Sequence, residues 1–172
     1  IEVGMQPVDI GVTDSLLIVA CMGSDEVWLV NLEDYSTKAI IPTSAEPVKI
    51  RISFDQSLAV VGCDELDLAE VIDLTIAEKI KTIPNFDVFL YKFSFISSNP
   101  RNSVYWSGFE IAPDNSYLVN GAAGPLRFYD LESGQIVHQI DEIQNAAQVA
   151  WSGDSSKLIT VTAVSPGVVS QV

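Results

Sequence analysis

Histidine, cysteine, basic residues and long apolar runs are all scarce in this sequence. It has one His and two Cys, and 9 Lys and Arg stand against 23 Asp and Glu, which gives a formal net charge of −14 at pH 7. Such a charge repels the phosphates of nucleic acids and of anionic lipids, so we expect no nucleic-acid partner and no membrane partner. The longest apolar run, residues 16–22, is far shorter than the roughly 20 residues of a membrane-spanning helix.

The motifs of the common catalytic and cofactor sites are also missing. No Gly-x-Ser-x-Gly motif, phosphate-binding glycine-rich loop or His-Glu-x-x-His motif occurs in the 172 residues. The single histidine, His138, has no Ser or Cys motif beside it, so a histidine-based triad or metal site lacks its main components. We therefore expect no catalytic residue, no metal site and no cofactor in this chain, and we expect His138 to be a partly exposed strand residue.

What the sequence does have is a repeat of about 42 residues. The unit at residues 6–42 agrees with the unit at 46–84 nearly throughout: Ser15 matches Ser57 and Cys21 matches Cys63, and both pairs are 42 residues apart. A third unit follows at 105–140, and a fourth, incomplete unit at 145–172. A period of about 40 to 45 residues is typical of β-propeller blades.

Within each unit, β-branched and aromatic runs alternate with Asp, Asn, Ser and Gly, as in short strands joined by tight turns. Asp114 and Asp154 are predicted to form the first turns of their units, and Gly134 a later turn that needs a positive φ. The predicted strands of the third unit are 109–112, 117–120, 126–130 and 135–140. The sequence thus predicts an all-β fold, a β-propeller with about four repeats of four-stranded antiparallel blades, the last blade incomplete, in one domain.

Several motifs of these units are similar to those of known propeller repeats. Pro7 and Pro47 precede the first strands, residues 113–114 (Pro-Asp) form a turn, and residues 71–74 (VIDL) and 81–84 (KTIP) lie in the second unit. With these motifs the chain resembles the YVTN-type and WD-type propeller repeat families, although the Trp-Asp dipeptide and the structural histidine of the WD family are missing. The resemblance implies the propeller architecture and leaves the activity open, because it consists of turn and core positions.

An insertion around residues 85–107 separates the second and third units. Within it, Phe89 and Tyr91 begin an alternation typical of a strand with an aromatic face, and Trp106 lies in a segment that can pair back to it as a hairpin. Two interpretations stand side by side. The segment either packs its aromatic side chains into the core of the third blade, or it protrudes as a binding loop with aromatic contact residues.

Acidic residues gather after the second strands of the first two units. They are Asp25, Glu26, Asp64, Glu65, Asp67 and Glu70. In a propeller, the turn after the second strand lies on the same face as the loop that enters the next blade, so we expect Phe89, Tyr91 and Trp106 beside these residues. We therefore predict a non-catalytic scaffold that binds a basic protein partner through an acidic face with an aromatic loop. A solvated acidic rim without a partner is the alternative.

A second function is open at this stage: an enzyme or ligand-binding propeller, similar to the lactonase-like relatives, with a site at the central channel completed by blades absent from this sequence. The two ends of the sequence bear on whether further blades complete the propeller. Residues 1–3 look like the tail of a fourth strand, and residues 168–172 like a third strand without its fourth. Such ends fit a closed four-bladed ring, but the families that the chain resembles usually have more blades. We therefore favour a part of a larger propeller, and next to it half-propellers that associate with each other.

The two cysteines occupy the same place in successive units. Equivalent atoms of neighbouring sheets are about 10 Å apart, beyond the roughly 7 Å between Cα atoms that a disulfide allows. We therefore expect Cys21 and Cys63 to be buried free thiols. Unpaired cysteines favour a reducing compartment, so we expect a cytoplasmic protein, with a cell-surface or secreted protein as the alternative.

Overall fold

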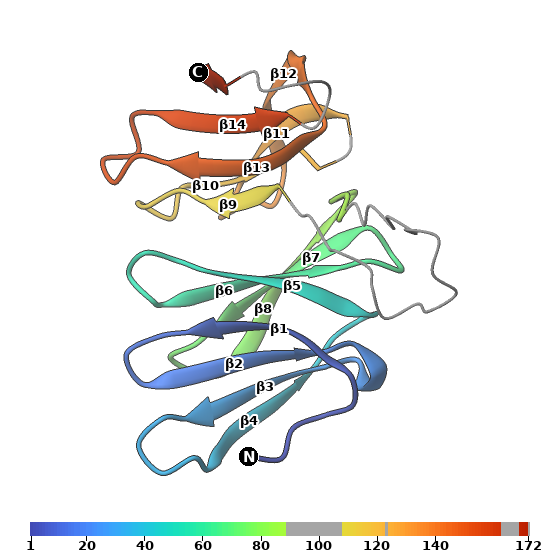
Figure 1. Ribbon diagram of the computed structural model, residues 1–172, viewed down its shortest axis with the longest axis vertical. Coiled ribbons are helices and arrows are strands. Elements are labelled where there is room, and N and C mark those ends of the chain that lie inside the picture. The colour runs from blue at the N-terminus through green and yellow to red at the C-terminus, as the bar shows by residue number, and fades with distance from the viewer. Residues whose placement is uncertain (89–107, 123, 163–168, 172) are drawn as a thin grey trace.

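The computed structural model describes residues 1–88, 108–122, 124–162 and 169–171, whose strands form four antiparallel sheets (Figure 1). Sheet 1 contains β1 (Pro7–Val12), β2 (Leu16–Cys21), β3 (Glu26–Asn31) and β4 (Thr37–Pro42), and the short 3-10 helix η1 (Met22–Ser24) connects β2 to β3. Sheet 2 contains β5 (Pro47–Ile52), β6 (Leu58–Cys63), β7 (Leu68–Asp73) and β8 (Glu78–Pro84). Sheet 3 contains β9 (Phe109–Ile111), β10 (Tyr117–Asn120), β11 (Pro125–Asp130) and β12 (Ile136–Gln144). Sheet 4 contains β13 (Ala146–Trp151), β14 (Leu158–Thr162) and β15 (Val169–Gln171).

The four sheets are consecutive blades of a propeller. In every sheet the strands are hydrogen-bonded in chain order, and the first strands contact one another from sheet to sheet, β1 with β5, β5 with β9 and β9 with β13. Figure 1 shows the sheets following one another along the long axis of the molecule. The prediction of an all-β partial propeller with an incomplete last blade is confirmed, and we refer to sheets 1 to 4 as blades 1 to 4.

The cores lie between adjacent blades. Because side chains of a strand alternate between its two faces, each blade can pack one face on the preceding blade and the other on the next. Buried residues that represent the three interfaces are Ile18 and Ile50 for blades 1 and 2, Val60 and Phe109 for blades 2 and 3, and Val119 and Val149 for blades 3 and 4. The blades therefore have no separate cores of their own.

The predicted turn residues act as expected. The carboxylates of Asp114 and Asp154 accept hydrogen bonds from the backbone amides of Ser116 and Ser156, at 3.0 and 3.1 Å, and also from the hydroxyls of those serines. These bonds favour the ionised form, so they lower the pKa of Asp114 and hold the pKa of Asp154 at about 2. Gly134 has a φ of 74°, in the region that favours glycine.

The strands of the third unit match the predicted bounds within one residue, except at the end of the last strand. β12 continues to Gln144, four residues beyond the predicted end at Ile140. The register between β11 and β12 shifts between Pro125 and Leu126, which pair with Gln144 and Ile140. A bulge of this kind adds residues to one strand without breaking the pairing, and the sequence pattern does not reveal it.

The closed four-bladed ring is not formed. The two chain ends lie at opposite ends of the molecule (Figure 1). The N-terminal segment folds back on blade 1, where the amides of Met22 and Gly23 donate to the carbonyls of Gln6 and Met5, both at 3.0 Å. Residues 1–3 therefore do not pair with blade 4 within one molecule.

Candidate interaction surface

The turns that carry the predicted acidic residues lie side by side along one edge of blades 1 and 2. Two backbone hydrogen bonds attach them to the connection from β4 to β5: Thr43 N to Asp25 O (2.8 Å) and Asp64 N to Glu46 O (3.0 Å). Two others attach the neighbouring chain to the same turns: Gly23 N to Met5 O (3.0 Å) and Phe86 N to Asp67 O (2.8 Å). We call residues 4–6, 22–26, 43–46 and 64–67 the acidic edge. The bond from Phe86, the second residue of the insertion, shows that the start of the insertion lies at the same edge as the two acidic turns.

Most of the predicted carboxylates on this edge face solvent. Asp25, Glu65 and Asp67 are exposed, and Asp25 and Asp67 have φ angles of 54° and 47°, a left-handed conformation that Asp tolerates better than most residues. Glu26 is half-buried, and its Oε2 accepts a hydrogen bond from Trp28 Nε1 at 3.0 Å. Asp64 is half-buried as well.

The expectation for Glu70 is wrong, because this residue belongs to β7 and not to the turn. Its side chain is completely buried and points towards blade 1. Glu70 Oε1 lies 2.8 Å from Lys79 Nζ and accepts hydrogen bonds from the hydroxyl (2.6 Å) and amide (3.1 Å) of Ser44. The physical reason is strand alternation: Leu68 and Ile72, two positions away on either side, face the same core.

Two apolar side chains on the acidic edge were not singled out from the sequence. Met5 is 66% exposed and Leu66 is 56% exposed. Leu66 lies between the exposed Glu65 and Asp67. Because Leu66 is flanked by two acidic residues in a predicted turn, the sequence could have indicated that its side chain is exposed. Exposed apolar side chains ringed by carboxylates are typical of a protein contact surface.

The aromatic part of the predicted surface lies outside the described residues. This applies to Phe89, Tyr91 and Trp106. The described chain on either side of them is buried, with Phe86 and Phe109 in contact at 5.2 Å between ring centroids.

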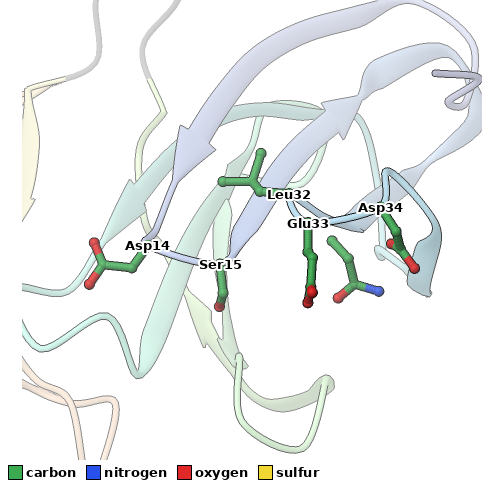
Figure 2. A pocket seen from close by; sticks show the side chains of 6 residues that line it. Asp14, Ser15, Leu32, Glu33 and Asp34 are labelled. Atoms are coloured by element: carbon green, nitrogen blue, oxygen red, sulfur yellow. The ribbon is translucent and has the colours of Figure 1, made fainter.

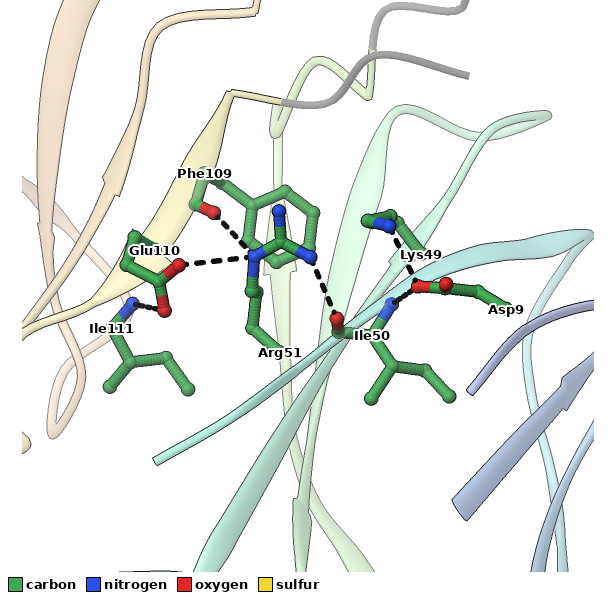
Figure 3. Close-up of polar contacts among 7 residues, drawn as sticks. All are labelled: Asp9, Lys49, Ile50, Arg51, Phe109, Glu110 and Ile111. Atoms are coloured by element: carbon green, nitrogen blue, oxygen red, sulfur yellow. Dashed lines mark hydrogen bonds and ion pairs between the residues drawn. The ribbon is translucent and has the colours of Figure 1, made fainter. Parts of the chain in front are cut away.

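The inner strands carry a second set of charges, which pair with one another across the blades (Figure 3). Asp9 Oδ2 lies 3.1 Å from Lys49 Nζ and accepts a hydrogen bond from the amide of Ile50 at 2.8 Å. Arg51 Nε lies 3.1 Å from Glu110 Oε2 and 3.2 Å from the carbonyl oxygen of Phe109. The first pair joins blades 1 and 2, and the second joins blades 2 and 3.

Burial affects the second pair. Desolvation raises the pKa of Glu110, and the neighbouring Arg51 opposes that rise. A shallow cavity of about 160 Å³ lies between Arg51 and residues of β13 and β14, among them Gln148 and Ile159. The Arg51 guanidinium thus lies beside a small, mostly apolar cavity, and its charge is already paired with Glu110.

The opposite edge of blade 1 holds a larger cavity that the sequence did not indicate (Figure 2). It measures about 540 Å³ and is lined by Asp14, Ser15, Asn31, Leu32, Glu33 and Asp34. The carboxylate of Asp34 already accepts bonds from the amide (2.9 Å) and hydroxyl (2.6 Å) of Ser36. Across the described parts of the chain, no group of three or more His, Cys, Asp or Glu side chains is placed to hold a metal ion.

The chain has one histidine and two cysteines, and the structure describes all three. His138 is exposed on β12 against the ring of Phe128. Cys21 and Cys63 are free and completely buried, as predicted, and burial raises the pKa of both thiols. No helix in the described ranges is long and apolar enough to cross a membrane.

Comparison with known proteins identifies the architecture. No family model matches the sequence, and no curated protein matches it. Solved structures of similar fold are numerous, with 972 matching chains, so the fold by itself selects no single activity. One of them is the hydrazine synthase of Kuenenia stuttgartiensis, which superposes with a TM-score of 0.73 at 17% identity over 97% of this chain and 46% of that chain. The chain thus spans about half the length of that protein and shares a β-propeller-like fold with it.

Proposed function

We propose that this propeller is a non-catalytic scaffold that binds a basic protein partner at the acidic edge. The observation that carries the proposal is the continuity of this edge: backbone bonds hold the two acidic turns against one connection, with Met5 and Leu66 exposed among the carboxylates. A rigid surface of this kind loses little conformational entropy on binding. The carboxylates attract a cationic partner over a distance, and the apolar side chains provide area to bury.

The chemistry of the partner follows from the two kinds of side chain. Asp25, Glu65 and Asp67 favour Lys or Arg, and Leu66 and Met5 favour apolar side chains between them. A strand or helix that carries both basic and apolar side chains on one face would complement this surface. The insertion, which contains Phe89, Tyr91 and Trp106, begins beside the same edge and in this proposal adds aromatic contacts.

A ligand site at the central channel has less support. Such a site needs polar groups that are available to a ligand. The inner-strand charges Asp9, Lys49, Arg51 and Glu110 are engaged with one another across the blades. We therefore propose that these charges hold neighbouring blades together and that the acidic edge binds the partner.

The test uses a charge-neutral variant of the edge, Asp25→Asn/Glu65→Gln/Asp67→Asn. Asn keeps the left-handed backbone that positions 25 and 67 require. The probe is a synthetic amphipathic peptide of Lys and Leu, and its affinity is measured by titration calorimetry. We expect about tenfold weaker binding for the variant at low salt, because three attractive charges are removed.

The control carries the same change in charge on the opposite edge, Glu33→Gln/Glu78→Gln/Glu132→Gln, where all three residues are exposed. It should bind the peptide nearly as well as the unchanged chain. If both variants lost the same affinity, the peptide would be responding only to the net charge of the protein, and the proposed surface would be wrong.

A further inference from the structure

Both acidic turns contain a residue with left-handed backbone, and each is held by a segment outside its own sheet. Asp25 and Asp67 have φ angles of 54° and 47°, and such a conformation persists in a non-glycine residue where surrounding contacts hold it. The carbonyl of Asp25 accepts a hydrogen bond from the amide of Thr43, and the carbonyl of Asp67 accepts one from the amide of Phe86, both at 2.8 Å. The conformation of each turn therefore depends on the segment that follows its blade.

The segment that follows blade 2, residues 85–88, is fixed to blade 3. The side chain of Phe86 is completely buried, and its ring centroid lies 5.2 Å from that of Phe109 and 5.3 Å from that of Tyr129. The hydroxyl of Tyr129 donates a hydrogen bond to the carbonyl of Asn85 at 3.0 Å. Because Phe109 and Tyr129 belong to β9 and β11, the segment packs on blade 3.

Asp87, the next residue of this segment, is held by blade 3 at two points. Its carbonyl accepts a hydrogen bond from Asn120 Nδ2 at 2.9 Å, and its Oδ2 lies 2.7 Å from Arg127 Nη1. Asn120 is buried, and the ion pair is partly buried, so water weakens it less than it would weaken an exposed pair. Since Asp87 directly follows Phe86, Arg127 fixes the chain next to the amide that bonds Asp67.

The junction of blades 1 and 2 has the same construction with the opposite charge. Glu70 and Arg127 occupy equivalent positions of β7 and β11, three residues before the last residue of each strand. Glu70 accepts hydrogen bonds from the amide and the hydroxyl of Ser44, the residue after Thr43. Arg127 binds the residue after Phe86. A charged side chain of the following blade thus holds the connection in both junctions.

We infer that Arg127 is a positioning residue for the acidic edge: through Asp87 and Phe86 it holds the turn of residues 64–67 in its left-handed conformation. The consequence for binding rests on the proposed function. A turn held in one conformation presents its carboxylates to a partner with little loss of conformational entropy on binding. Blade 3 thereby sets the affinity of a surface that lies on blades 1 and 2.

The variant Arg127→Gln tests the positioning by NMR, without any partner. The order parameters of the backbone amides of residues 65–67 should fall from about 0.85, the value of rigid backbone, to below about 0.6. The amide of Phe86 should exchange its hydrogen at least about tenfold faster. The turn of residues 22–25, which Thr43 holds, is the internal reference and should not change. Unchanged order parameters at residues 65–67 would overturn the inference.

The same variant tests the effect on binding. Arg127→Gln should bind the Lys and Leu peptide about threefold more weakly, the size expected for an effect carried by an intermediate segment. The substitution removes one cation, so the formal net charge changes from −14 to −15. If net charge alone determined the affinity, the cationic peptide would bind more tightly. Equal or tighter binding would therefore contradict a role of Arg127 in positioning the acidic edge.

The matched control is Arg51→Gln, which has the same change in charge. Arg51 joins the same two blades, but through Glu110 and the Phe109 carbonyl on the inner strands. This control should keep the order parameters of residues 65–67 and should not weaken binding. Arg127→Lys, which retains the positive charge, should restore both properties. Equal losses in the two glutamine variants, with unchanged circular dichroism, would assign the effect to blade docking in general and overturn the inference.

The inference and the proposed function fail in different measurements. If the charge-neutral variant of the acidic edge bound the peptide as well as the unchanged chain, the proposed function would be wrong. The order parameters of residues 65–67 in Arg127→Gln would still decide whether Arg127 positions the turn. If that edge variant lost affinity while Arg127→Gln kept both its order parameters and its affinity, the proposed function would stand and the inference would be wrong.

Discussion

Glu70 is a completely buried carboxylate that is paired with one basic side chain, Lys79. Its side chain has no exposed surface, Oε1 bonds Lys79 and Ser44, and Oε2 has no hydrogen-bond partner. Lys79 has 30% of its side chain exposed, so only the carboxylate has lost its hydration completely. Removing the lysine would leave an uncompensated charge in the interface of blades 1 and 2.

We predict that Lys79→Met lowers the free energy of unfolding by about 3 kcal/mol, the scale for breaking a buried ion pair from one side. Urea unfolding followed by fluorescence measures the change. In a Glu70→Gln background the same substitution should have a much smaller effect. An equal loss in both backgrounds would show that the lysine stabilises the protein by packing and not by charge.

The thiol of Cys63 is the second residue whose chemistry depends on burial. Desolvation, with the nearby Glu70 carboxylate adding to it, raises the pKa of Cys63 from 9.0 to about 12. Since the thiolate is the reactive form, we predict that iodoacetamide at about pH 8.5 modifies the folded protein at least about a hundredfold more slowly than the unfolded protein. Mass spectrometry over time gives both rates.

The same shift has a consequence for stability. The folded state binds the Cys63 proton more tightly than the unfolded state does. The contribution of this proton to the free energy of unfolding is therefore complete below pH 9.0, and it declines as the pH rises towards 12.

The alkylation experiment can contradict the burial of Cys63. It would do so if the folded and the unfolded protein were alkylated at similar rates.

At the scale of the strands, the inner-strand ion pairs tie neighbouring blades together. Arg51 contacts the Glu110 carboxylate and the Phe109 carbonyl, and its guanidinium lies 5.5 Å from the centre of the Phe109 ring. The pKa of Glu110 is raised by desolvation in spite of this arginine. A carboxyl group with a raised pKa destabilises the folded state increasingly as the pH rises through that pKa.

We predict that Arg51→Met destabilises the protein more at pH 7 than below pH 4.5, the ordinary pKa of a glutamate. At low pH Glu110 is protonated in both states, so the lost charge pairing has little effect there. Urea midpoints at the two pH values measure the difference. In a Glu110→Gln background, Arg51→Met should lower the stability by the same amount at both pH values. If its effect still depended on pH there, a group other than Glu110 would be responsible.

At the scale of the whole molecule, the net charge of −14 opposes the compact state. We predict that the Tm at pH 7 rises by a few degrees when NaCl increases from about 0.01 to 0.15 M, because the Debye length falls from about 30 to 8 Å. Calorimetry measures this rise. Near the pI of about 4.1 the same salt should have little effect. A Tm at pH 7 that does not change with salt would show that local ion pairs balance the repulsion.

The sequence by itself determined the blades and their turns. The strand runs and the Asp-x-Ser turns at Asp114 and Asp154 are local signals, because they act between residues close in the chain, and the 42-residue period shows that these signals recur. It also predicted that Asp25 and Asp67 belong to one edge, since equivalent turns of successive repeats recur on the same side. Strand alternation would have placed Glu70 in the core, but its acidic neighbours in the sequence suggested a surface position.

Only the tertiary structure decided which groups meet. The Lys49–Asp9 and Arg51–Glu110 pairs join residues that lie in different blades, and no local pattern indicates their partners. Ile10 and Ile50 follow the same motif in their strands, yet one is 61% and the other 3% exposed. The physical reason is that burial depends on the surface lying opposite a residue, and that surface is supplied by a different blade.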